Sequence, residues 1–455
     1  MLPASTADFG RYLKRVTLIA TALLWLSMLV LPTAYEPAKG LLLAVVMSAL
    51  LSRAWMERRL RVDRIIIFLS LAYAGAGLFW VGLGVVQHAP GALQMSPVFV
   101  LWPIVYTLLI SGADDGTLAK SGRVLLAAAL FICAYSLLFV LTGIHVLPSS
   151  WFVDLHQDAR IGIYPGFVQF NLSSLTTLLF LVPYLVAVQA TKPLLRPLTW
   201  RDGVVWSALA GSALVAAFSL RRSLIVLVVL SPVIALILLV AVSDRQITFR
   251  LRRLVVIAAV VAALMGLGVS AVAAVTTGKP TDNKTFVTNV ASGFDLAGGS
   301  QIGATERRDQ FWALIDGWTQ HPILGAGLGA TVSLRRSVDQ PWAYELVYVD
   351  LLFQTGVVGL LVYTAGVGWI YWQCIKSMRR TRDLIPRLLP VLAGTTGFLI
   401  ANATDPYLAK FDYIWVLFLP IAYLNYSFNR RSPTAPDVLP TERQFSARAQ
   451  EPPIS

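Results

Sequence analysis

Apolar stretches about twenty residues long recur from one end of this 455-residue chain to the other. A helix needs about 20 apolar residues to cross the hydrocarbon core of a bilayer, and no water-soluble fold buries so many runs of that length. We count about twelve such stretches. They lie near residues 16–35, 38–53, 65–86, 96–111, 123–146, 167–190, 203–220, 223–243, 254–276, 346–375, 384–403 and 411–428. The sequence therefore predicts an all-α polytopic membrane protein in which each stretch forms one transmembrane helix.

The placement of the basic residues predicts the orientation of these helices. A net charge of +13 could suit a nucleic-acid partner, because a basic surface neutralises phosphates. Most of the 37 Lys and Arg residues, however, fall in alternate connections, such as Arg58 to Arg61, Arg250 to Arg253 and Arg379 to Arg382. Cytoplasmic loops carry such an excess of basic residues. We therefore expect membrane lipids and no nucleic acid as partners, and cytoplasmic N- and C-termini.

The chain divides into a transmembrane domain at residues 1–429 and a tail at 430–455. The tail is rich in Pro, Ser and charge, so we expect it to be disordered and cytoplasmic. Two connections on the opposite side are long enough to carry a site: residues 147–166, which include Trp151, His156 and Arg160, and the larger segment 277–345. Neither Cys133 nor Cys374 has a partner at a spacing typical of a disulfide framework or a metal site.

Within the larger segment, the sequence predicts a short amphipathic helix at Glu306–Gln320. Phe311, Ile315 and Trp318 recur at helical spacing and form its expected apolar face, which would rest on the bundle or on the membrane surface, with Arg308 on the same side. Three glycines at 325, 327 and 329 follow the helix and predict a mobile turn. They do not form a dinucleotide loop, because no strand is expected before them and the spacing is not G-x-G-x-x-G.

Two arginines interrupt the longest apolar region of the chain. Residues 203–243 are almost uniformly apolar except for Ser219, Leu220, Arg221, Arg222 and Ser223, where two spans must turn on the outward side. Arginine at membrane depth is expensive and usually has a specific partner. A guanidinium binds phosphate oxygens through two parallel hydrogen bonds, so a phosphate or pyrophosphate head group is one fitting partner. The alternative is that both arginines reach ordinary lipid head groups as anchors of the helix ends.

A carboxylate begins the tenth expected span. Glu345, Tyr348, Leu352, Gly356 and Gly359 would share one face of a continuous helix, since their spacing is close to whole helical turns. The two glycines would allow close helix packing. Glu345 is then a candidate general base at the outer end of the face. Alternatively, it pairs with an arginine such as Arg308 or Arg335 at the level of the head groups.

Three pieces of this sequence resemble a known superfamily, that of the O-antigen polymerases, O-antigen ligases and O-linked oligosaccharyltransferases. The first piece is the turn at residues 219–223. The second is Arg308, Asp309, Gln310, Phe311 and Trp312, followed by the run from His321 to Gly329, which is similar to R-x-x-x-W and h-P-x-x-G-x-G-x-G. The third is Glu345 to Gly359, which resembles [H/E]-x-x-[L/Y]-x-x-x-L-x-x-x-G-x-x-G. The expected spans and the large outward loop before the tenth span also match.

The resemblance implies a membrane fold like that of the C-type glycosyltransferases (GT-C) in a bacterial inner membrane, with the active site in the periplasm. The donor would be a glycan linked to undecaprenyl pyrophosphate, and the acceptor a glycan or a lipid. Arg221, Arg222 and Arg308 would bind the pyrophosphate, Glu345 and Arg308 would be catalytic, and Trp312, His321, Tyr344 and Tyr348 would contact the glycan. No metal or other cofactor is expected, because arginine can stabilise the leaving group. Chain-length regulator and flippase proteins are expected partners.

Three activities remain open. Ligases and oligosaccharyltransferases of this superfamily usually carry histidine where this chain has Glu345, so we favour a polymerase of O-antigen or exopolysaccharide over a ligase that acts on lipid A-core. A transporter of lipid-linked oligosaccharides would share the membrane and the substrate. Ion-coupled transporters usually show ionisable residues near the bilayer midplane and repeats between the two halves, and the sequence shows neither feature.

Overall fold

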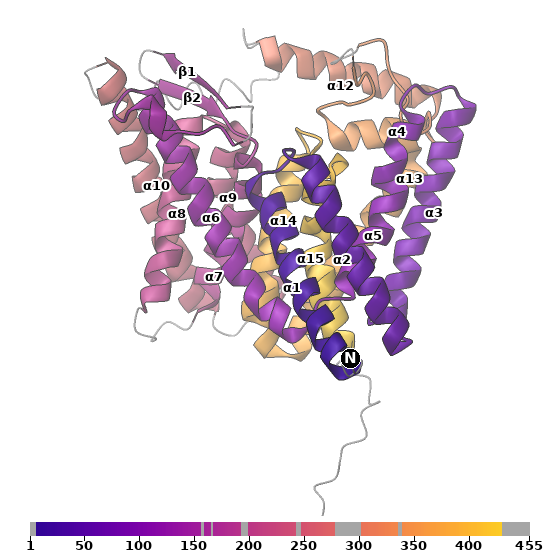
Figure 1. Ribbon diagram of the computed structural model, residues 1–455. Helices are drawn as coiled ribbons and strands as arrows, with labels where there is room; N and C mark the ends of the chain where they lie inside the picture. Colours follow the sequence, from indigo (N-terminus) through magenta and orange to yellow (C-terminus); the bar gives the residue numbers. More distant parts are fainter. Residues whose placement is uncertain are drawn as a thin grey trace, which may run out of the picture.

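The computed structural model describes residues 6–155, 159–164, 167–192, 199–242, 247–277, 302–334 and 339–429. Long helices dominate it, as the apolar runs predict (Figure 1). The first half contains α1 (Thr6–Val30), α2 (Glu36–Glu57), α3 (Arg64–Val86), α4 (Ala92–Ser96), a π-helical turn (Pro97–Leu101), α5 (Trp102–Ile110), α6 (Asp115–Gly143) and α7 (Leu175–Thr191). The second half contains α8 (Trp200–Ser219), α9 (Arg222–Ala241), α10 (Ile247–Thr277), α12 (Ile302–Gln320), α13 (Val347–Arg380), α14 (Ile385–Asn402) and α15 (Phe411–Asn429). Single 3-10 turns lie at Ser149–Trp151, Arg382–Leu384 and Tyr407–Ala409.

Nine helices in the described part of the chain are long and apolar enough to cross a membrane. They are α2, α3, the continuous helix from α4 to α5, α6, α8, α9, α10, α13 and α14 with its preceding 3-10 turn. Helices α1, α7 and α15 occupy the positions of the three other expected spans. The chain therefore has the architecture of a mostly helical polytopic membrane protein. The full number of about twelve spans stays a prediction.

A β-hairpin is the one departure from an all-α fold among the described residues. Strand β1 (Arg160–Tyr164) pairs antiparallel with β2 (Phe167–Asn171), with Ile161 opposite Phe170. The span expected at 167–190 therefore begins only at Leu175, because the residues before it form a strand and a turn. Phe170 and Leu172 are buried in the main core, so the apolar residues before Leu175 belong to the strand and the turn and not to the span.

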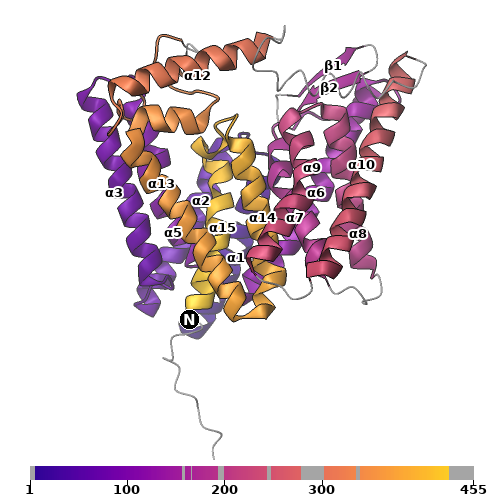
Figure 2. The same cartoon turned by 180° about the vertical axis from the view of Figure 1, so that it is seen from behind.

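The helices form three groups when the molecule is seen from the side. In Figures 1 and 2, α6 to α10 lie on one side, α1, α2, α14 and α15 in the middle, and α3, α4, α5 and α13 on the other side. The main hydrophobic core joins the first two groups and extends to α5 and the last part of α13, and two smaller clusters pack α3, α12 and α13 together. Helix α12 and the β-hairpin lie at one end, which we call the loop end, and the N-terminus lies at the other, which we call the N-terminal end (Figure 1).

Candidate active site

The segment from His321 to Ala330 is wedged between helices at the loop end. Gly325, Gly327 and Gly329 each have a φ between 75° and 82°, a left-handed conformation that favours glycine. Each also lies against backbone, with Gly325 on the kink of α13, Gly327 on α3 and Gly329 on the residues that begin α4. A Cβ atom at any of the three would overlap its neighbour. The G-x-G-x-G spacing is thus required by backbone conformation and close contact.

Hydrogen bonds hold this glycine segment on both sides. The Leu328 amide donates to the Trp80 carbonyl over 3.0 Å, and the Gly91 amide donates to the Gly329 carbonyl over 3.1 Å. The indole of Trp80 donates to the Leu324 carbonyl over 2.9 Å. Residues 325–330 are buried. The expectation of a mobile turn is therefore wrong, because the segment fixes α3 and α13 relative to each other.

Helix α13 is not continuous. Gly356 has φ 65° and ψ −173°, and the amides of Val357 and Val358 donate to the carbonyls of Pro322 and Ile323 instead of to the preceding turn of the helix. Glu345 lies before the first residue of the helix, Val347. The single face expected for residues 345–359 is therefore not formed. A glycine is needed at 356 for the kink, and only Gly359 makes the expected close packing, against Thr355 and Trp80.

Helix α12 docks on the bundle through a face that only partly coincides with the expected one, because Trp318 packs beside Leu314 but Phe311 does not. Leu314 is fully buried and Gln310 is 5% exposed, whereas Phe311 and Trp312 are 36% and 62% exposed. The Gln310 amide oxygen accepts hydrogen bonds from the backbone amides of Glu345 and Leu346, at 2.9 and 3.3 Å. Gln310 therefore ties α12 to the segment that carries Glu345. The face with Phe311 and Arg308 points away from this contact.

An ion pair joins α12 to Glu345. The Arg307 Nε atom lies 2.5 Å from a Glu345 carboxylate oxygen, and Arg307 thus takes the place in which the sequence led us to expect Arg308. The Arg308 side chain is 46% exposed, and its Nε atom lies 3.7 Å from Asp309. Arg335, the other expected partner, lies outside the described residues. Arg307 is also close enough to Arg222 for their positive charges to repel each other.

The turn between α8 and α9 positions Arg221 and Arg222. Leu220 adopts a left-handed conformation with φ 49°, and α9 begins at Arg222, so the chain reverses within two residues. The Arg221 Nη2 atom donates to the Tyr407 hydroxyl over 2.6 Å, and the guanidinium lies 5.6 Å from the centre of the Tyr407 ring. The Arg221 Nη1 atom is buried and has no hydrogen-bond partner among the described residues.

Tyr407 belongs to the short segment between α14 and α15. Burial raises the pKa of the Tyr407 phenol above its ordinary value, so the hydroxyl keeps its proton. It donates this proton to Asp405 over 2.8 Å while it accepts from Arg221. The Leu408 amide donates to the Asn402 side chain over 3.0 Å, which fixes the segment at the end of α14. Arg221, Tyr407 and Asp405 thus form a connected polar chain.

The expected glycan-contacting residues have different surroundings. Tyr344 is 1% exposed and its hydroxyl accepts from the Val332 amide, so it is a core residue and not a surface contact. The Tyr348 hydroxyl donates to the Leu399 carbonyl of α14 over 2.6 Å, and its ring is 39% exposed. Trp312 and His321 are exposed. Tyr348 also contacts Asn402, and it therefore links the segment of Glu345 to the segment of Tyr407.

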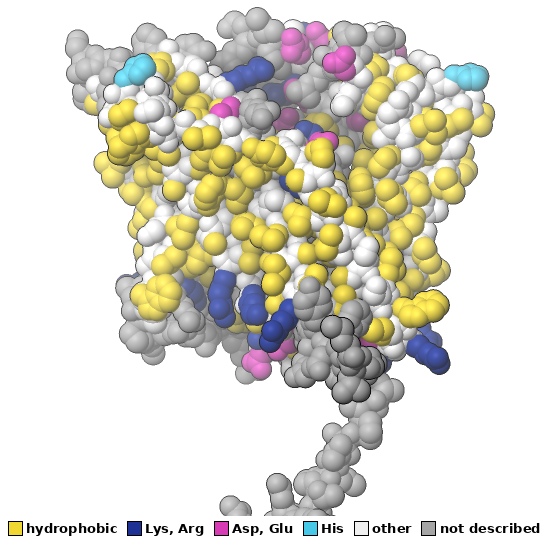
Figure 3. Space-filling view, in the orientation of Figure 1, with side chains coloured by type: hydrophobic (Ala, Val, Ile, Leu, Met, Phe, Trp, Pro, Cys, Tyr) yellow, Lys and Arg dark blue, Asp and Glu magenta, His cyan; other side chains and the backbone are white. Residues whose placement is uncertain are grey.

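These contacts bring the basic and acidic residues of the candidate site to the loop end. Figure 3 shows dark-blue and magenta side chains gathered in a recess there, above the band of hydrophobic side chains. The sequence did not identify four residues of the candidate site: Arg307, Gln310, Asp405 and Tyr407. Tyr407 two residues after Asp405, in an expected outward turn, was the one pattern that could have indicated a polar contact there. His156 and Asp158, in the other long connection, lie outside the described residues, as does the tail. Among the described residues, no three His, Cys, Asp or Glu side chains are grouped so that they could hold a metal ion.

The chain matches no model of a protein family, and no curated protein sequence matches it.

Proposed function

We propose that this chain is a membrane glycosyltransferase that polymerises a glycan carried on a polyprenyl pyrophosphate. The observation that carries the proposal is the buried Arg221 Nη1 atom without a hydrogen-bond partner in the described part of the chain. A buried polar group without a partner costs about 1–3 kcal/mol, and more when the group is charged. A bound anion would satisfy it. Arg222 and Arg307 at the same end supply two further positive charges.

A diphosphate has the charge and shape that these groups would bind. A guanidinium donates two parallel hydrogen bonds to phosphate oxygens and stays charged at neutral pH. Three guanidinium groups would therefore hold the diphosphate and stabilise the negative charge that develops on it as it leaves. The exposed rings of Trp312 and Tyr348 are available to contact a sugar. These features support an oligosaccharide carrier with a diphosphate as the substrate.

Glu345 is the proposed general base. The acceptor hydroxyl gives its proton to the Glu345 carboxylate while its oxygen bonds to the anomeric carbon, and the bond from that carbon to the pyrophosphate breaks. The electron pair leaves with the carrier pyrophosphate, and a single displacement inverts the configuration. The ion pair with Arg307 holds the Glu345 carboxylate. The incoming diphosphate would compete for Arg307 and release Glu345 for this step.

The charge distribution supports a periplasmic site in a bacterial inner membrane. Arg58 and Arg59 after α2, Lys192 after α7 and Arg379 and Arg380 at the end of α13 all lie at the N-terminal end. Figure 3 shows further Lys and Arg side chains along this lower edge. Because basic residues favour the cytoplasmic side, the N-terminal end would be cytoplasmic and the loop end periplasmic. This is the face on which a flipped lipid-linked glycan becomes available.

The test is polymerisation by the purified full chain from undecaprenyl-pyrophosphate-linked repeat units. The wild type should produce carrier-linked chains of several repeats, and Arg221→Ala should lose at least tenfold of this activity, whereas the exposed Arg380→Ala control keeps it. Wild-type activity in the Arg221→Ala variant would refute the proposal. Transfer of preformed polymer to a lipid acceptor without extension would identify a ligase, and movement of the donor across vesicles without bond formation would identify a transporter.

A further inference from the structure

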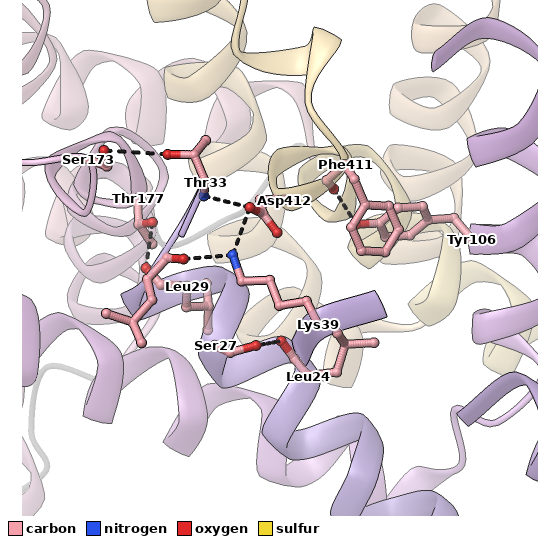
Figure 4. A network of polar contacts seen from close by, with 11 residues as sticks. Leu24, Ser27, Leu29, Thr33, Lys39, Tyr106, Ser173, Thr177, Phe411 and Asp412 are labelled. Carbon is pink, nitrogen blue, oxygen red and sulfur yellow. Dashed lines mark hydrogen bonds and ion pairs between the residues drawn. The ribbon is translucent and has the colours of Figure 1, made fainter. Parts of the chain in front are cut away.

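A buried ion pair lies near the candidate site but does not belong to it. Lys39 of α2 and Asp412 of α15 are 4% and 6% exposed, and their charged atoms are 2.8 Å apart (Figure 4). The Lys39 Nζ atom also donates to the Leu31 carbonyl over 2.6 Å. Removing one member of such a pair leaves an uncompensated buried charge. The pair therefore holds the start of α15 against the turn between α1 and α2.

The turn that Asp412 contacts has an unusual backbone. Thr33 and Tyr35 have φ values of 61° and 54°, and a left-handed conformation is a genuine outlier for a β-branched residue such as Thr33. The Thr33 amide donates to the Asp412 carboxylate over 2.6 Å, and Figure 4 shows Thr33 and Lys39 meeting the same carboxylate. Local strain of this kind persists only when the surrounding structure determines it. Asp412 is thus held from two directions.

Only four residues separate Asp412 from Tyr407, which holds Arg221. The Phe411 carbonyl accepts from the Tyr106 hydroxyl over 2.7 Å, so the segment is fixed at this point as well. The Tyr407 ring also packs edge-on against Tyr413, in the first turn of α15, with ring centres 5.8 Å apart. A shift in the first turn of α15 would therefore move Tyr407. The hydroxyl that orients the Arg221 guanidinium would move with it.

We propose that Lys39 and Asp412 are positioning residues for Arg221, acting through Tyr407. This assignment rests on the proposed function, because it takes the Arg221 guanidinium as the group that binds the diphosphate. A purely structural ion pair would change stability alone. A positioning pair changes the affinity for diphosphate, and its effect depends on the arginine fork that Tyr407 orients.

The experiment measures the binding of inorganic pyrophosphate to the full chain in detergent by calorimetry. Asp412→Asn and Lys39→Met should each weaken binding at least fivefold, in the range of typical coupling between sites. Lys39→Arg keeps the charge and should restore most of the affinity. The matched control is Lys192→Met, which breaks the partly buried ion pair of Lys192 with Asp202 at the N-terminal end and should leave the affinity unchanged.

Coupling to Arg221 decides between positioning and general damage. In an Arg221→Lys background the fork is absent, and Asp412→Asn should then weaken binding less than twofold further. An equal loss in both backgrounds, unchanged affinity in Asp412→Asn, or an equal loss in Lys192→Met would overturn the assignment. If Asp412→Asn does not fold, the double variant Lys39→Met with Asp412→Asn takes its place, because it removes both buried charges. It should show the same loss of pyrophosphate affinity and the same dependence on Arg221. If the wild type does not bind pyrophosphate, the proposed function itself is overturned. If Arg221→Lys weakens binding but Asp412→Asn and Lys39→Met do not, only the positioning role is overturned.

Discussion

Two glycines on one helix offer a direct test of how the glycine segment is held. Gly84 and Gly82 are both in α3, two residues apart. A Cβ atom at Gly84 would overlap the Leu328 carbonyl oxygen and touch Ala92, whereas nothing lies within 4 Å of one at Gly82. Gly84→Ala should therefore displace the segment of residues 321–330. Gly82→Ala should not.

The size of the effect follows from a difference between the two variants. Alanine gains about 1 kcal/mol over glycine in a helix, and this gain applies equally to both positions. At Gly84 the added methyl must also be accommodated against backbone, and overpacking of this kind costs about 1–3 kcal/mol. A displaced Leu328 amide would lose its hydrogen bond to the Trp80 carbonyl, for about 0.5–1.5 kcal/mol more. Gly84→Ala should thus be about 1.5–4.5 kcal/mol less stable than Gly82→Ala.

Unfolding by titration with a denaturing detergent, followed by tryptophan fluorescence, measures this difference in the purified chain. Polymerisation should also fall in Gly84→Ala at a temperature at which both variants remain folded. The reason is that the segment holds α13 at its kink, and Glu345 lies just before the first residue of the same helix. Equal stability of the two variants would refute the reasoning, because the methyl at Gly84 would then have found space that the contacts exclude.

Two further predictions concern the candidate site. Arg307→Gln should lower polymerisation at least tenfold, because it removes both a cation and the partner of Glu345. Arg308→Gln, on the exposed face, should keep polymerisation within twofold of the wild type. The free energy of unfolding of both variants should change by less than about 1 kcal/mol, since the Arg307 ion pair is partly exposed to solvent. Tyr407→Phe keeps the aromatic ring over Arg221 but loses the hydroxyl that orients the guanidinium. Because hydrogen bonds to charged groups contribute about 1.5–3 kcal/mol, the KM for the carrier-linked donor should rise at least tenfold, with little change in expression. An unchanged KM, or a larger loss in Arg308→Gln than in Arg307→Gln, would contradict these assignments.

Nine of the expected spans coincide with helices of the described residues that are long and apolar enough to cross a membrane, because hydrophobicity largely determines where such helices lie. The docked face of α12 could not be predicted. Phe311, Ile315 and Trp318 are spaced as an apolar face, but Phe311 is exposed, and Leu314 is buried against the bundle with Trp318 beside it. An amphipathic helix at the loop end can place an apolar face against the bundle or against the membrane surface. Periodicity then does not distinguish the two faces, and the choice between Arg307 and its neighbour could not be made from the sequence.

The contacts that hold the site depend on residues far apart in the chain. Lys39 and Asp412 are separated by 373 positions, and Arg221 and Tyr407 by 186. Each of these residues lies next to a helix end, where a charged or aromatic side chain has an ordinary explanation as an interface anchor. The sequence shows the G-x-G-x-G motif but does not predict that it packs between α3 and α13. The positive φ values and the close backbone neighbours that require glycine are properties of the folded chain.

The two halves of the site are held by separate devices. The glycine segment fixes α13, and Glu345, the partner of Arg307 in α12, lies just before that helix. The Lys39 and Asp412 pair fixes the segment that orients Arg221. Arg222 and Arg307 lie near enough for their positive charges to repel each other, although Glu345 offsets part of the charge of Arg307. A diphosphate between the halves would reverse the sign of this interaction and satisfy the buried Arg221 nitrogen as well. Each half is anchored in its own helices, so an anion that bound between them would meet cations already in place and would not have to order them.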